Sequence, residues 1–142
     1  MNQEFRCECP ITSAIDILGD KWMLIIIKQM LLEGMETFKD FTNSDEAVST
    51  SILTLKLKCL ESYGLVERKN HPSNKKTKLY QLTDKGLSLA PVVVDLAIWS
   101  DQNLREYNPI IRQSDELKFM KSNREDAIIA LKRKYKKKLA TT

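Results

Sequence analysis

The stretch VSTSILTLKLKCLESYGLVERK, residues 48–69, decides the fold. Its apolar residues recur at helical spacing, which predicts a helix with one buried face formed by Leu53, Leu57 and Leu60. Ser49 is a typical N-cap for this helix, and Gly64 suits the left-handed residue just beyond its end. The opposite face carries short hydroxyl side chains and lysine instead of the usual mixture of glutamate and lysine. Such a composition is unusual for a face that only meets water.

The flanking sequence predicts helices before this stretch and a small β-hairpin at its end. Two runs suited to strands, residues 65–69 and 78–82, are separated by NHPSNKKT, whose proline and asparagines favour a turn. Upstream, apolar residues from Ile11 to Leu32 have helical spacing with a break at Gly19-Asp20, which predicts two helices. Thr37 is the expected N-cap of a short third helix. Helices followed by a two-stranded ribbon are the order of a winged helix-turn-helix.

The sequence after the hairpin predicts further helices. Thr83 is the expected cap of the first, and Pro91 should kink or break it. A short helix should begin at Ser114. Residues 122–125, SNRE, have the pattern of a capping box ahead of a last helix, which is rich in lysine.

The composition is that of an ordinary globular protein, with 42% hydrophobic and 30% charged residues. The longest apolar run, residues 22–27, is far too short to cross a bilayer, and the first residues do not resemble a secretory signal. We therefore expect a cytoplasmic protein without a membrane partner, whose three cysteines are thiols. The net charge of +4 is uneven: residues 118–142 hold nine Lys/Arg against two Asp/Glu, whereas residues 1–117 hold 14 against 17.

Hydroxyl and cationic residues along the central helix and the hairpin predict contact with double-stranded DNA. Short hydroxyl side chains near a helix N-terminus let the backbone approach phosphates and can reach base edges in the major groove. Lysines further along the helix, or at the hairpin tip, can meet the sugar-phosphate backbone. The simpler interpretation is that the hydroxyls cap the helix and the lysines are solvated. The candidate DNA-binding residues are Ser49, Thr50, Ser51, Thr54, Lys56, Lys58, Lys75, Lys76 and Lys78.

Several short motifs resemble the HxlR-type winged helix-turn-helix transcriptional regulators. They are CP at 9–10, ILGDKW at 17–22, TFKDF at 37–41, the stretch quoted above, LYQLTDKG at 79–86 and DLAIW at 95–99. The resemblance implies a bacterial homodimer that binds a palindromic operator, with the N-terminal segment and the long helix after the hairpin at the subunit interface. It places the recognition helix at residues 49–63 and the wing at residues 70–77.

The resemblance also adds one candidate residue and a division into domains. The family usually has an arginine before the phenylalanine of its second helix, where this chain has Thr37, so Lys39 is the candidate substitute for a phosphate contact. The implied fold class is α+β, mainly α with a small β-hairpin: a winged helix-turn-helix with additional N- and C-terminal dimerisation helices. Residues 1–108 are the expected DNA-binding and dimerisation domain, and residues 109–142 a basic helical extension.

Cys9 is the candidate redox residue. By its place before Pro10 it resembles the N-terminal cysteine through which some members of the family sense oxidants or electrophiles. Arg6 would favour its thiolate and Glu8 would oppose it. The alternative is a thiol partly buried at the dimer interface. One CxC pair, one further cysteine and one histidine do not make a typical metal site, and no nucleophile motif or phosphate loop stands out. We expect no metal, no cofactor and no enzyme activity.

Three points stay open from the sequence alone. The winged helix could be a protein-interaction module without specific DNA binding, with the acidic balance of residues 1–117 matching a basic partner. A small-molecule or oxidant effector is compatible with the family but is not identified by the residues. The lysine-rich last helix could bind DNA without sequence preference, lie on an anionic membrane or a partner chain, or be a solvated face over a packed apolar stripe.

Overall fold

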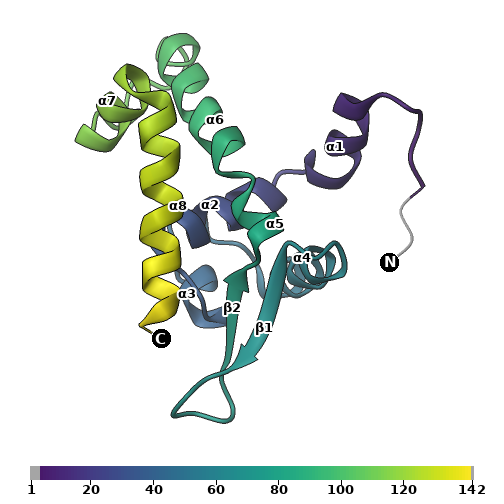
Figure 1. The fold of residues 1–142 in the computed structure, drawn as a ribbon. Coiled ribbons are helices and arrows are strands. Elements are labelled where there is room, and N and C mark those ends of the chain that lie inside the picture. Colours follow the sequence, from purple (N-terminus) through teal and green to yellow (C-terminus); the bar gives the residue numbers. More distant parts are fainter. Residues whose placement is uncertain (1–3, 142) are drawn as a thin grey trace. The chain divides into compact units, whose positions relative to one another are not determined.

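The structure is a computed structural model that describes residues 4–141. These residues form two compact units, one up to Leu87 and one from Ser88 onward. The first unit contains α1 (Pro10–Leu18), α2 (Met23–Glu33), α3 (Phe38–Thr42), α4 (Thr50–Ser62), β1 (Val66–Asn70), β2 (Lys78–Leu82) and α5 (Asp84–Leu87), as Figure 1 shows. The second unit contains α6 (Ala90–Asn103), α7 (Asp115–Ser122) and α8 (Arg124–Ala140). The elements are mainly helical with one hairpin, which confirms the predicted fold class.

The first unit has an apolar core formed by side chains from α2, α3, α4 and the hairpin, while α1 contributes no buried side chain. The predicted leucine stripe of α4 is buried, and α4 packs against α3 and β1. Full burial of one such side chain stabilises a fold by about 1.5 to 3 kcal/mol relative to exposure. The most deeply buried large apolar side chains of the unit are Met23, Ile26, Ile27, Met30, Phe41, Leu53, Leu57 and Leu60.

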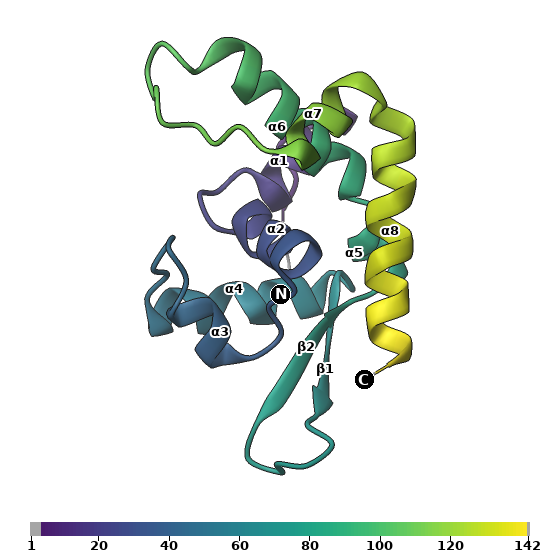
Figure 2. The same cartoon turned by 90° about the vertical axis from the view of Figure 1, so that its left-hand side faces the viewer.

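The two strands pair antiparallel, with a register that runs from Val66 opposite Leu82 to Asn70 opposite Lys78. The first strand begins one residue later than expected, because the N–H of Leu65 still donates to the Leu60 carbonyl at the end of α4 (2.9 Å). The N–H of Tyr80 donates to the Glu36 carbonyl (2.7 Å), which ties the segment before α3 to β2. In both views the tip of the hairpin extends beyond α3 and α4 (Figures 1 and 2).

The caps predicted from the sequence explain several of the helix ends. The Ser49 hydroxyl accepts from the N–H of Ile52, and Gly64 has a φ of 72°. Thr37 and Asp40 form a capping box at the start of α3. Pro91 lies in the first turn of α6 and separates it from α5, which confirms the predicted break.

One predicted cap is wrong. Ser122 is the last residue of α7, and its hydroxyl donates to the Lys118 carbonyl (2.9 Å) rather than capping α8. Asn123 is the N-cap of α8 and makes no side-chain cap hydrogen bond. The SNRE pattern misleads because Ser122 is close enough to the end of α7 to bond back to its own helix.

In the second unit, α6 packs against both α7 and α8. Asp101 is only 8% exposed. Its carboxylate forms ion pairs with the Arg105 guanidinium (Nη2 to Oδ1, 2.5 Å) and the Lys121 ammonium (Nζ to Oδ2, 2.7 Å). Hydrogen bonds from Lys121 and Arg105 hold the pKa of Asp101 below its usual value. The Lys121 contact joins α6 to α7, and the two compact units therefore divide after Leu87 and not at residue 108. The proposed functional division at 108 stays a prediction. Over residues 4–141, the helices are all too short or too polar to cross a bilayer.

Candidate nucleic-acid interface

The exposed side of α4 forms a contiguous polar face opposite the buried leucines. Positions 51, 54, 55 and 58 follow the i, i+3, i+4, i+7 spacing of one helix face, and all four side chains are exposed. The residues are Ser51, Thr54, Leu55 and Lys58. We call this set the α4 face. It contains three of the predicted DNA-binding residues, and Thr50 lies exposed at its edge.

Leu55 is a member of the α4 face that was not predicted from the sequence. Its side chain is 50% exposed although it is apolar. The signal was present in the spacing, because Leu55 is four residues from Ser51 and falls outside the Leu53, Leu57 and Leu60 stripe. An apolar side chain on a face of this kind is suited to the C5-methyl group of thymine.

The hydroxyls near the start of α4 are partly used by the helix itself. Ser49 accepts from the N–H of Ile52 (3.4 Å), so its first role is that of a cap. The Thr54 hydroxyl donates to the Thr50 carbonyl (2.8 Å), which leaves its oxygen as an acceptor for a further donor. The simpler interpretation therefore holds for Ser49, while Ser51 and Thr54 keep hydrogen-bonding capacity toward solvent.

Lys56 lies off the α4 face. Its ammonium pairs with the Asp20 carboxylate (2.6 Å), which also accepts from the N–H groups of Trp22 and Met23 at the start of α2 (2.8 Å each). Burial by itself raises the pKa of Asp20, but the hydrogen bonds from Lys56, Met23 and Trp22 outweigh it and hold that pKa below its usual value. Asp20 thus caps α2 and ties it to α4. From the sequence, Asp20 is part of a helix break and of the ILGDKW motif, and neither predicts its ion pair with Lys56.

The turn between α3 and α4 is anchored on α2. The Glu46 carboxylate accepts from Lys28 and from the amide of Gln29, which also donates to the Ser44 hydroxyl (2.9 Å). Gln29 is fully buried, and Ala47 has a positive φ of 52°. These contacts fix the backbone that enters α4, so that the N-terminal end of the α4 face has a defined position.

The tip of the hairpin is shaped by its own short side chains. The Asn74 side-chain oxygen accepts from the N–H of Lys76 (3.0 Å), and the His71 ring Nδ1 accepts from the N–H of Ser73 (3.1 Å). Lys75, Lys76 and Lys78 are all exposed. The Lys78 ammonium also donates to the Asn70 side-chain oxygen. The predicted wing is therefore an ordered tip that presents its lysines to solvent.

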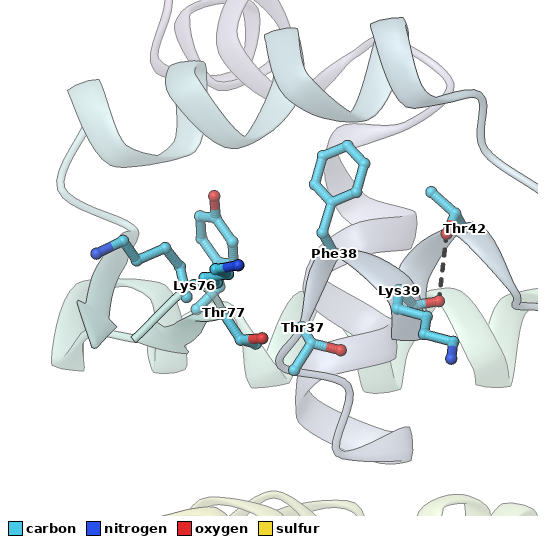
Figure 3. A pocket seen from close by; sticks show the side chains of 8 residues that line it. Thr37, Phe38, Lys39, Thr42, Lys76 and Thr77 are labelled. Atoms are coloured by element: carbon cyan, nitrogen blue, oxygen red, sulfur yellow. Dashed lines mark hydrogen bonds between the residues drawn. The ribbon is translucent and has the colours of Figure 1, made fainter. Parts of the chain in front are cut away.

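A pocket of about 600 Å³ lies between α3 and the hairpin (Figure 3). Its lining includes three lysines from two elements: Lys39 on α3, and Lys76 and Lys78 on the hairpin. Hydroxyl and aromatic side chains complete its lining. They are Thr37, Thr42, Thr77, Phe38 and Tyr80. A pocket with this lining is suited to an anion such as a phosphate group.

Cys9 is exposed at the N-cap position of α1. The N–H and hydroxyl of Thr12 and the N–H of Ile11 lower the pKa of its thiol. Arg6 does not supply this effect, since its guanidinium pairs with the Asp16 carboxylate (2.5 Å). The expectation that Arg6 favours the Cys9 thiolate is therefore wrong. The hydrogen-bond donors in the first turn of α1 lower the pKa of the Cys9 thiol instead. Across residues 4–141, His, Cys, Asp and Glu side chains form no group of three or more able to hold a metal ion.

Known proteins with similar sequences and folds are transcriptional regulators. The HTH-type transcriptional regulator YodB of Bacillus subtilis is 36% identical over 95 residues, which cover 66% of this chain and 84% of YodB. The redox regulator HypR in its reduced form has a TM-score of 0.61 at 28% identity, covering 71% of this chain and 99% of HypR. Reduced YodB from B. subtilis has a TM-score of 0.55 at 35% identity, and the match covers 68% of this chain and 95% of the YodB chain. YodB is also known in quinone-bound and diamide-treated forms.

The family match spans most of the elements described above. Residues 17–108 match the profile described as HxlR-like helix-turn-helix, which begins within α1 and extends past α6. It includes the α4 face, the hairpin and the lysine-lined pocket. The chain belongs to the HxlR-like helix-turn-helix family of transcriptional regulators.

Proposed function

We propose that this DNA-binding regulator acts as a homodimer on a palindromic operator and reads it with the α4 face. The observation that carries the proposal is the α4 face itself, whose hydrogen-bonding and apolar groups are exposed on a helix with a fixed N-terminal end. A recognition helix in the major groove uses its N-terminal residues to contact base edges. Thr50, Ser51, Thr54 and Lys58 are the proposed reading and positioning residues, and Leu55 is added to them.

The lysines around the pocket and at the hairpin tip are the proposed contacts to the DNA backbone. Phosphate contacts fix the register of a protein on a duplex without reading its sequence. Lys39, Lys75, Lys76 and Lys78 belong to this group. Ser49 contributes as a helix cap, and its exposed position leaves the start of α4 open to a phosphate. Lys56 is omitted, because its ammonium is engaged by Asp20.

The homodimer is supported by apolar side chains that each unit leaves exposed. On α1, Ile11 is 70% and Ile15 is 52% exposed. On α6, Leu96 and Trp99 are 49% and 56% exposed, although both side chains are largely apolar. Exposed apolar surface of this kind is typical of helices that pack against a second subunit. A C2 dimer would present two copies of α4 to the two halves of a palindrome.

The proposed function is tested by fluorescence anisotropy with DNA from upstream of the chain's own gene and a scrambled duplex of equal length, over a salt series. We expect tighter binding to the native fragment at every salt concentration. Equal binding to both duplexes that collapses as salt rises would indicate only a basic surface. Absence of binding to either duplex, together with a protein that co-purifies, would favour the protein-interaction module instead.

Cys9 is the proposed sensor of electrophiles, since its exposed thiol has a lowered pKa. With a quinone, the thiolate adds to a ring carbon, a C–S bond forms, and the ring takes up a proton to give the hydroquinone. We expect this adduct to change operator affinity by about tenfold, a typical coupling between two sites. The Cys9→Ser variant should not respond, whereas Cys59→Ser should respond like the natural chain. A Cys9→Ser variant that still responds would remove Cys9 as the sensor.

A further inference from the structure

Helix α8 lies beyond residue 108, outside the part of the chain that matches the family. Its two sides differ sharply. One side is buried, with Ala127, Ile128 and Tyr135 each no more than 5% exposed, and α8 packs against α6 and α7. The other side carries four exposed cations within little more than one helical turn. They are Arg133, Lys134, Lys136 and Lys137.

Stability of the helix does not account for these cations. Arg133, Lys136 and Lys137 are neighbours at i, i+3 and i+4, where like charges destabilise a helix by a few tenths of a kcal/mol per pair. The acidic residues of α8, Glu125 and Asp126, are confined to its first turn, and the sequence has no Asp or Glu after residue 126. The helix dipole favours cations in the last turn only. The positive charge is therefore concentrated where a polyanion could compensate it.

The packing of α8 also argues against a membrane surface as its partner. A basic amphipathic helix binds a bilayer by burying its apolar face among the lipids. Here that face is already buried within the protein, and the exposed side of α8 offers Ile129 as its one large apolar side chain. A contact that depends on charge alone remains, and the phosphate backbone of DNA fits it.

We propose that the exposed cations of α8 bind the DNA backbone beside the operator and strengthen binding without reading sequence. The proposal rests on the proposed DNA-binding function, and it assigns the C-terminal extension a role of its own in this chain. Each phosphate that is neutralised steepens the salt dependence of the binding constant by a slope of about 0.9. Four cations per chain are enough to supply a substantial share of the total salt dependence of DNA binding.

The test compares two double variants of the full chain on a mixed-sequence duplex over a salt series. In Arg133→Gln with Lys137→Gln, two α8 cations are lost while helix propensity is kept. We expect the slope to fall by about 1.8 for each chain that engages DNA, and affinity to fall roughly tenfold or more at moderate salt. The matched control, Arg112→Gln with Lys118→Gln, removes two exposed cations outside α8 and should leave the slope nearly unchanged. Equal thermal melts show that both variants fold.

Each other outcome overturns the proposal in an identifiable way. If the α8 variant binds with the natural slope, α8 does not touch DNA, while the proposed function stands. If the control variant loses as much slope, the effect is one of general charge and not of α8. If the natural chain binds no duplex at all, the proposed function fails first. If the natural chain binds vesicles of phosphatidylcholine with phosphatidylglycerol and the α8 variant does not, the partner of α8 is a lipid surface and not DNA.

Discussion

Replacing Gly86 by alanine is expected to lower the free energy of unfolding by about 3 kcal/mol or more, at the upper end of what overpacking costs. Gly86 is buried in α5. A Cβ atom at this position would lie 2.1 Å from the Leu65 carbonyl oxygen and 3.1 Å from Cδ2 of Leu82. The Leu65 carbonyl cannot move freely, because it accepts from the N–H of Thr83 (3.1 Å). The clash therefore forces apart α5 and the start of the hairpin.

Gly64→Ala is the matched control. Gly64 has a positive φ of 72°, but the nearest atom to an added Cβ is Cδ of Lys85 at 4.0 Å. Alanine there meets backbone strain without a clash, at a cost of about 1 to 2 kcal/mol. Urea denaturation followed by circular dichroism measures both values. A Gly86→Ala chain that is as stable as Gly64→Ala would show that α5 can shift away from Leu65 at little cost.

Gly86 illustrates which features could be predicted from the sequence. The caps at Ser49 and Thr37 and the break at Pro91 depend on residues a few positions apart, so local patterns were enough to place these three helix ends. The contact between Gly86 and Leu65 joins residues far apart in the sequence and leaves no local pattern. The glycine was quoted as part of a motif, but its physical reason is visible only in the packed structure.

The same distinction applies to the candidate site. The candidate lysines on α4 and the hairpin follow from composition and order, and Lys39 on α3 follows from the family resemblance. The grouping of these lysines in space could not be predicted. Tertiary contacts place Lys39, Lys76 and Lys78 around one pocket, and they hold Lys56 off the α4 face through its ion pair with Asp20. Leu55 was not a candidate because only hydroxyl and cationic side chains were considered for contact with DNA. An exposed apolar side chain on a binding face has no such simple signal in its residue type, so only its helical spacing could have indicated it.

Replacing Lys75, Lys76 and Lys78 together by glutamine is expected to weaken DNA binding roughly 100-fold at about 0.15 M salt. The estimate assumes three lost phosphate contacts per chain, each with a slope of about 0.9, so that the salt dependence becomes shallower by about 2.7 and the roughly 100-fold loss applies to each chain that engages DNA. The three side chains are exposed, and the tip is shaped by Asn74 and His71, so the hairpin should keep its fold. Because backbone contacts carry no sequence information, native and scrambled duplexes should lose affinity alike.

Thr54→Ala separates this effect from base reading. It removes one hydroxyl from the α4 face and no charge, so the salt slope should stay as it is while the preference for the native duplex narrows. The salt slope therefore reports on the hairpin lysines. The ratio of the affinities for the native and scrambled duplexes reports on α4. A wing variant that lost affinity only for the native duplex would contradict the backbone role of its lysines. An unchanged ratio in Thr54→Ala would mean that bases are read from another position, with Ser51 and Leu55 the next to replace.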